Sequence, residues 1–299
     1  MINPQPSLSR FDLVRMMGFS FDAMPANTQG QAFGVKYVRL DEPDGGQLFI
    51  TRYGWRFIDH ILPDQWYHDR AYLIRGKKLP RATSAVYRVP TWDRNRRRTD
   101  LVVRFSRLAQ DVPLMLTSET EREVAPDERY HARFNSPFEE FGRLFDLKRA
   151  PASPDLPRIL TKRPLAIYSP GREQPVWKLG RHKSQFTLHR NELKREQQPD
   201  ATHATFDLDI KRDYIMVYQW VKGIDAEMAM NAGLIDEREA RQLTRRVNRE
   251  LKARGFRVLD NKPRHFIVRV WPRTGQLLRR HGKIAYALID FELLERLTR

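Results

Sequence analysis

Apolar residues recur with the two-residue period of half-buried strands in several short runs of the chain. Turn-forming residues separate these runs, as in the acidic, glycine-rich turn at 41–46 and around Gly76. The runs that predict strands in the first half are 35–40, 47–54, 71–75, 84–89 and 100–108. This half is therefore expected to be rich in β-structure.

Residues 135–150 show the period and start signals of a helix. Ser136 is placed to act as N-cap, Pro137 occupies the first helical position, and Glu139 and Glu140 stand in the first turn. The apolar residues that follow keep helical spacing: Phe138, Phe141, Leu144 and Phe145. One helix is thus expected among the strands.

A second helix is predicted over residues 236–256, with Asp236 as cap and Gly255 as stop. Residues 213–223 form a strongly apolar strand-like run before it, and two further strands are predicted at 265–270 and 283–291. The polar stretch 172–207 is assigned to no element. Strands and helices in this order predict an α+β fold with two lobes.

The overall composition fits a folded protein. The 299 residues are 40% hydrophobic and 30% charged, and no apolar run approaches the length of a membrane span. The N-terminal residues lack the features of a signal peptide, so a cytoplasmic protein is expected. Because the chain has no cysteine, disulfides, thiolate zinc sites and cysteine nucleophiles are excluded.

Positive charge dominates, with a formal net charge of +17. Such a surplus attracts polyanions, which include nucleotides, nucleic acid and acidic proteins. It is densest at residues 93–100, 240–257 and 277–283. No zinc-finger, helix-turn-helix or RNA-recognition pattern is present to favour nucleic acid over the others.

Several catalytic patterns are absent from the sequence. It contains no Gly-x-Ser-x-Gly elbow, no His-Glu-x-x-His pair and no phosphate-binding Gly-x-x-x-x-Gly-Lys-Ser/Thr loop. The eight histidines are dispersed, and no metal-ligand spacing is recognised among them.

Two short segments resemble motifs of the protein-kinase-like fold. "LDNKPRHFIV" resembles the Asp-x-Lys-Pro-x-Asn catalytic loop, with Asp260, Lys262 and Pro263 in register and His265 where the family has its metal-binding asparagine. "ALIDFE" resembles the Asp-Phe-Gly strand end, with Asp290 as metal ligand. The resemblance implies that Asp260 is the catalytic base, that Lys262 assists it, and that His265 and Asp290 hold Mg²⁺ or Mn²⁺.

Looser matches concern the nucleotide. "LVVRFSR" resembles the strand that carries the phosphate-binding lysine, with Arg104 at that position. "SPFEEFG" resembles the helix that supplies its glutamate partner, for which Glu140 is favoured over Glu139. The segment that takes the place of the glycine-rich loop contributes Gly76, Thr83 and Ser84.

The run "YIMVYQWVKG" resembles the connector between kinase lobes, whose backbone would meet adenine between Tyr218 and Trp220. The resemblance covers about residues 71–295. It implies an N-terminal extension over 1–70, a strand-rich N-lobe with one helix over 71–222, and a reduced helical C-lobe over 223–299.

Three functions remain open. The resemblance implies an atypical ATP-dependent phosphotransferase, with a nucleotide and an acidic protein as partners and ATP with Mg²⁺ or Mn²⁺ as cofactors. A pseudokinase that binds nucleotide or serves as a scaffold is the second. The third is a basic nucleic-acid-binding protein whose motifs match by coincidence. Each site residue also has an ordinary structural role open to it, such as capping a turn or pairing with an arginine.

Overall fold

The structure is a computed structural model, and it describes residues 18–80, 84–112, 114, 132–151, 153, 156–197 and 203–297. The chain is a mixed α+β protein, as predicted, and it contains a large antiparallel sheet. Its contacts divide it into two compact units. The first comprises Met1–Asp111, Ser136–Gly142 and Arg163–Trp220, and the second comprises Val112–Asn135, Arg143–Lys162 and Val221–Arg299.

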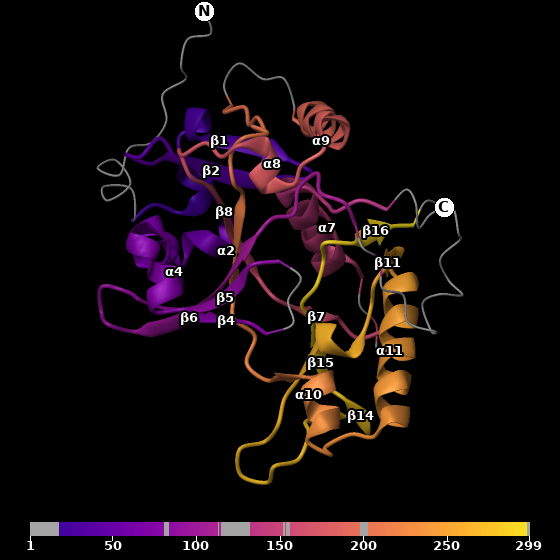
Figure 1. The fold of residues 1–299 in the computed structure, drawn as a ribbon. Helices are drawn as coiled ribbons and strands as arrows, with labels where there is room; N and C mark the ends of the chain where they lie inside the picture. The colour runs from indigo at the N-terminus through magenta and orange to yellow at the C-terminus, as the bar shows by residue number, and fades with distance from the viewer. Residues whose placement is uncertain are drawn as a thin grey trace, which may run out of the picture. The chain divides into compact units, whose positions relative to one another are not determined.

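The first unit is built on an eight-stranded antiparallel sheet (Figure 1). In chain order its strands are β1 (Gln29–Ala32), β2 (Val35–Asp41), β3 (Gln47–Thr51), β4 (Lys77–Lys78), β5 (Val86–Trp92), β6 (Arg98–Phe105), β8 (Pro164–Ser169) and β9 (Ile215–Gln219). Across the sheet they run β1-β2-β3-β8-β9-β6-β5-β4. Residues 29–51, predicted to belong to an extension, thus supply three strands of the same sheet.

The central strands β8 and β9 carry apolar runs that are buried on both faces of the sheet. On one face, alternate residues such as Val38, Leu48 and Val217 join a large apolar core. On the other face, Tyr37 and Phe49 pack edge-on against Phe138. The Phe206 ring completes this cluster, because it stacks on Phe138 and lies edge-on to the other two rings. The period of two along each strand therefore assigns every side chain to one of two cores.

The second face is covered by the helix α7 (Pro137–Arg149), whose first residues belong to the first unit. Gly142 on this helix lies against Phe33, because a Cβ at position 142 would stand 2.4 Å from the Phe33 Cβ and 2.7 Å from its carbonyl oxygen. Only glycine allows that approach. The helix is thereby held close to the β1–β2 turn.

The remaining helices of the first unit are short except for one. The α-helices are α2 (Arg52–Trp55), α3 (Ile58–Ile61), α4 (Ala71–Ile74), α8 (Val176–Leu179) and α9 (Lys183–Glu196). The 3₁₀ turns are η1 (Phe21–Ala23), η2 (Ala26–Thr28), η3 (Pro63–Gln65) and η4 (His68–Arg70). Helix α9 lies in the polar stretch to which the sequence assigned no element.

The second unit contains a four-stranded sheet in the order β10-β12-β15-β7 and two two-stranded sheets. Its strands are β7 (Leu160–Thr161), β10 (Ile224–Asp225), β11 (Phe256–Val258), β12 (Phe266–Val268), β13 (Arg279–Arg280), β14 (Lys283–Ile284), β15 (Tyr286–Leu288) and β16 (Leu294–Arg296). Its helical elements are α10 (Ala226–Asn231), α11 (Glu237–Lys252), η5 (Pro263–His265) and the end of α7.

Helix α11 confirms the predicted helix and its start. The Asp236 side chain accepts from the Glu239 backbone N–H at 2.6 Å, and the Glu239 carboxylate accepts from Asp236 N at 3.3 Å, which completes a capping box. The buried residues of this helix recur at helical spacing: Ala240, Leu243, Thr244, Val247 and Leu251. Figure 1 shows α11 as the long orange helix beside β11.

Three strand predictions were wrong in detail. The run 47–54 is a strand only as far as Thr51, because Thr51 caps helix α2 at Arg52–Trp55. Residues 71–74 form helix α4, closed by a bond from Arg75 N to Ala71 O, and its apolar residues Leu73 and Ile74 are exposed. The apolar residues there were mistaken for the buried side of a strand. The run 283–291 is divided into β14, which pairs with β13, and β15, which pairs with β12. Within the described residues, no helix is both long and apolar enough to cross a membrane.

His60 on α3 offers a test of this core. Its Nδ1 lies 3.1 Å from Thr91 Oγ1, whose own hydroxyl donates to Thr99 O, so Nδ1 carries the proton and Nε2 faces Thr99 Oγ1 at 3.3 Å. Burial lowers the pKa of His60, although Asp93 and Asp59 oppose the shift.

Because the folded pKa of His60 is lowered, the unfolded chain binds more protons below the ordinary histidine pKa of about 6.5. Folding stability should therefore fall as the pH drops below that value, by at most about 1.4 kcal/mol per pH unit for one proton. In His60→Gln this contribution is removed. Urea unfolding between pH 7.5 and pH 5.5 should show a smaller loss for the variant, and equal losses would contradict the assignment.

Candidate functional site

A buried ion pair joins the sheet of the first unit to its covering helix. Arg104 on β6 pairs with Glu140 on α7, and the Tyr218 hydroxyl on β9 donates to the same carboxylate. Arg104 is 5% exposed and Glu140 is fully buried. The guanidinium also lies 5.9 Å from the Tyr218 ring centre. The three residues meet because residues 102, 104, 216 and 218 all face α7.

The two neighbouring glutamates of α7 have different partners. Glu139 completes the capping box with Ser136, in bonds of 3.2 and 3.3 Å, and its Oε2 lies 3.6 Å from His189 Nδ1. Glu140 points instead to Arg104. The structure thus brings Glu140 rather than Glu139 to the arginine. Contact of either residue with a nucleotide stays a prediction.

Gly76, Thr83 and Ser84 were expected to take the place of a glycine-rich, phosphate-binding loop. Gly76 lies between α4 and β4, where a Cβ would stand 2.1 Å from Tyr72 O, so close packing alone requires glycine. Ser84 is half-buried beside β5. Thr83 lies outside the described residues. This part of the chain offers no visible phosphate cradle among the residues described.

Tyr218 and Trp220 were expected to present their backbone to adenine. Tyr218 lies in β9 between Val102 of β6 and Pro164 of β8, so both sides of its backbone face a neighbouring strand. Trp220 N donates to Asp100 O at 3.0 Å, and its ring lies 4.6 Å from the Arg88 guanidinium. Of the two, Trp220 lies beyond the end of the strand, and its side chain is only partly buried.

A second set of charged residues converges in the second unit. Lys262 Nζ lies 2.6 Å from Asp260 Oδ2, and His265 Nε2 lies 3.3 Å from Asp290 Oδ2. Asp260 follows β11, His265 ends η5 beside β12, and Asp290 follows β15. A bond from Ile289 N to His265 O at 3.0 Å ties the two ends together. The β12–β15 pairing thus brings His265 and Asp290 together although they are distant in the chain.

Two buried acceptors in this set have no hydrogen-bond partner: Asp260 Oδ1 and His265 Nδ1. Burial lowers the pKa of His265 in spite of the carboxylates of Asp290 and Asp260, so the ring is neutral at pH 7. Since Nε2 faces the Asp290 carboxylate, it is the protonated nitrogen, and Nδ1 holds a bare lone pair. Each of these two buried acceptors could take a hydrogen bond or a cation, because a buried acceptor is ordinarily satisfied.

Sequence reasoning missed Asn261, which is fully buried next to this set. Its Nδ2 donates to Asn248 Oδ1 on α11 at 2.7 Å, while its own Oδ1 has no partner. The bond fixes the loop after β11 to the helix. A buried asparagine between an aspartate and a lysine carries no sequence signal, because Asn is ordinarily an exposed loop residue.

No metal-ligand spacing was recognised in the sequence, but the structure contains a cluster of residues that could hold a metal ion. Glu139, His189 and Glu192 place one ligand atom each within 4.8 Å of one another, and the first two residues are buried. Mixed nitrogen and oxygen donors suit Zn²⁺ or Mn²⁺. His189 and Glu192 stand three residues apart on α9, a spacing that becomes visible only once 183–196 is known to be helical.

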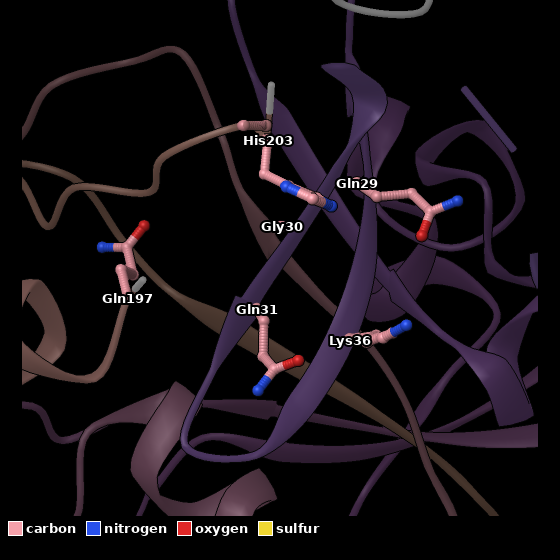
Figure 2. A pocket seen from close by; sticks show the side chains of 7 residues that line it. Gln29, Gly30, Gln31, Lys36, Gln197 and His203 are labelled. Atoms are coloured by element: carbon pink, nitrogen blue, oxygen red, sulfur yellow. The ribbon is translucent and has the colours of Figure 1, made fainter. Parts of the chain in front are cut away.

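A small hollow in the first unit is lined mainly by polar side chains (Figure 2). Its lining residues are Gln29, Gly30, Gln31, Lys36, Gln197, His203 and Ala204. Its volume of about 50 Å³ accepts one or two water molecules rather than a nucleotide. Gln197 is already bonded to Phe206 through both its amide atoms.

No protein-family model matches this chain, and a search of curated proteins found no match to it. Any functional proposal therefore rests on the residues themselves.

The buried ion pair can be tested by changing one partner and then both. Glu140→Gln leaves the Arg104 charge buried without its counter-charge and should lower the free energy of unfolding by about 3–5 kcal/mol. The double variant Arg104→Met with Glu140→Leu removes both charges and should cost much less than the two single changes together. Urea denaturation measures all of them.

The control is Arg52→Met, which removes an exposed pair with Asp22 and should change stability by less than about 1 kcal/mol. If Glu140→Gln is as stable as this control, the ion pair does not hold α7 to the sheet.

Proposed function

We propose that the chain is an atypical ATP-dependent phosphotransferase of the protein-kinase-like class. The observation that supports this most directly is that Asp260 pairs with Lys262 and His265 with Asp290, while Asp260 Oδ1 and His265 Nδ1 are buried without a partner. These residues follow one another in the order of a kinase catalytic loop and metal-binding strand end.

The ion pair of the first unit adds to this. Active kinases require a cation on a sheet strand paired with a glutamate of the following helix. Arg104 on β6 and Glu140 on α7 form such a pair. The likeness concerns the pairing alone, because the Arg104 guanidinium is buried against Glu140 and Tyr218 and is not open to phosphate oxygens.

The roles follow from the chemistry of each group. Asp260 would accept the proton of the attacking hydroxyl through a carboxylate that Lys262 holds in place. Lys262 would also offset negative charge on the transferring group. Arg104 is 5% exposed and already paired with Glu140, so its guanidinium is not open to nucleotide phosphates. The resemblance makes His265 and Asp290 the ligands of Mg²⁺ or Mn²⁺, which would neutralise charge on the phosphates. Because the Asp290 carboxylate faces Nε2, His265 would bind the ion through Nδ1, and Asp290 would orient the ring. A histidine ligand favours Mn²⁺ over Mg²⁺.

A pseudokinase is the alternative, and two observations favour it. Asp260 is already paired with Lys262, and Asp290 with His265, so much of the charge is neutralised within the unit. The segment around Gly76 also lacks the flexible glycines that cover the phosphates in active kinases. Such a protein would bind nucleotide or a partner without transfer.

Nucleotide-dependent stabilisation tests the binding step. ATP with Mn²⁺ should raise the unfolding temperature of the wild-type chain, because a ligand at 100 times its Kd adds about 2.7 kcal/mol. Asp290→Ala should abolish the shift. The matched control is Asp236→Asn, which removes a carboxylate from the same unit and keeps the α11 cap. No shift in the wild type with either Mg²⁺ or Mn²⁺ would refute nucleotide binding.

Transfer itself separates the enzyme from the pseudokinase. Incubation with γ-labelled ATP should label the chain or an added acidic protein, and Asp260→Asn should lose at least about 99% of the label while keeping the thermal shift. Stabilisation of the wild type without any label would favour the pseudokinase. Label that persists in Asp260→Asn would remove this residue from the chemistry.

A further inference from the structure

The second unit carries an arm with an unusual charge pattern. Between residues 261 and 289 the sequence contains no aspartate or glutamate. The basic residues in this stretch are Lys262, Arg264, Arg269, Arg273, Arg279, Arg280 and Lys283. Apart from the first two, they belong to the strand extensions and turns that follow β12, which Figure 1 shows as the gold loop below α10.

Backbone bonds give the arm, residues 269–285, a defined register. Val270 is bridged to Leu277, with Trp271 N bonded to Gln276 O at 2.8 Å and Leu278 N to Arg269 O at 2.7 Å. Beyond it, Arg280 pairs with Lys283 across a two-residue turn at 281–282, where both residues have positive φ. The arm is therefore a small three-stranded ribbon.

The two faces of this ribbon differ. Residues directly opposite one another share a face, and successive residues along a strand point to opposite faces. One face holds Leu277, Arg279 and the buried Ile284, and Arg279 pairs with Glu239 of α11 at 2.7 Å. This inner face is therefore used by the fold.

The outer face holds Arg269, Trp271, Arg280 and Lys283, all exposed, with the Trp271 side chain 56% accessible. In the described part of the chain, none of the three cations forms an ion pair. Arg273 adds a fourth exposed cation at the turn. An exposed tryptophan among unpaired cations contributes little to stability, so the folded state alone does not account for it.

We propose that this outer face binds single-stranded nucleic acid. Cations that track phosphates and an aromatic ring on which a base stacks are the two components of such sites. Arginine suits both, since its planar group binds phosphate and stacks on bases. A membrane surface fits less well, because bilayer binding needs a continuous apolar face. Among residues 269–285, all of which the structure describes, Trp271 alone is a large apolar side chain that is exposed rather than partly or fully buried.

The proposed nucleic-acid site does not depend on the phosphotransferase proposal. The net charge indicates only a polyanion as partner, whereas the outer face indicates single-stranded nucleic acid. None of the outer-face residues belongs to the set around Asp260, so nucleotide-induced stabilisation should be unchanged in the variants that test the arm.

The test measures binding of a fluorescent 20-nucleotide poly-uridine RNA to the full chain by anisotropy at several salt concentrations. Arg269→Gln with Arg280→Gln and Lys283→Gln should weaken binding at least tenfold and reduce the salt dependence by about two in log–log slope. Trp271→Ala should weaken binding about tenfold and leave the slope unchanged.

The matched control removes the same charge from exposed positions of α11 with Arg238→Gln, Arg245→Gln and Arg249→Gln. It should change affinity less than threefold. Equal losses in the control and the arm variant would overturn the proposal in favour of unspecific attraction by net charge. Absence of RNA binding by the wild type, or binding of anionic phosphatidylserine vesicles that depends on the arm while RNA binding does not, would also overturn it.

Discussion

A buried charge must have a partner, and this constraint shapes both units of the chain. In the first unit Arg104 is enclosed by the sheet and α7, and Glu140 with the Tyr218 hydroxyl supplies its counter-charge and hydrogen bonds. The pair adds little stability relative to apolar side chains of similar size, but the loss of one member is costly. It therefore fixes α7 to one register on the sheet.

In the second unit, the charged residues around His265 are paired, but not all of their polar atoms have a partner. Asp260, Lys262, His265 and Asp290 satisfy one another only in part, and two buried acceptors are left without donors. Native proteins rarely leave such atoms orphaned unless a ligand, an ion or catalysis uses them. The pairing of Asp260 with Lys262 and of His265 with Asp290 is what directs the functional proposal to the second unit.

The sequence predicted the fold class and most of the elements, since period and capping signals are local. The α11 capping box and the α7 start could be read from Asp236 and Ser136. Helix α4 could not, because four residues are too few to show a period, and α9 was hidden by its many charged residues. The sheet order could not be predicted either, because it depends on pairing between distant segments.

In the candidate sites, too, local motifs could be recognised in the sequence, whereas contacts between distant segments could not. A motif in the chain pointed to Asp260 and Asp290, but their meeting at His265 depends on the pairing of β12 with β15. Asn261 and the Glu139–His189–Glu192 cluster carried no readable signal. The outer face of the arm became apparent only when the register separated Arg279, which is paired, from Arg269 and Arg280, which are not.

The central claim is that the set of charged residues around His265 accepts a divalent cation. The most direct measurement is proton NMR of the histidine rings during titration with Mn²⁺ and ATP, with the His265 signal identified by its loss in His265→Gln. The account predicts that substoichiometric Mn²⁺ broadens the His265 resonance selectively in the wild type and not in Asp290→Ala. A His265 signal that stays sharp while other histidines broaden would contradict it.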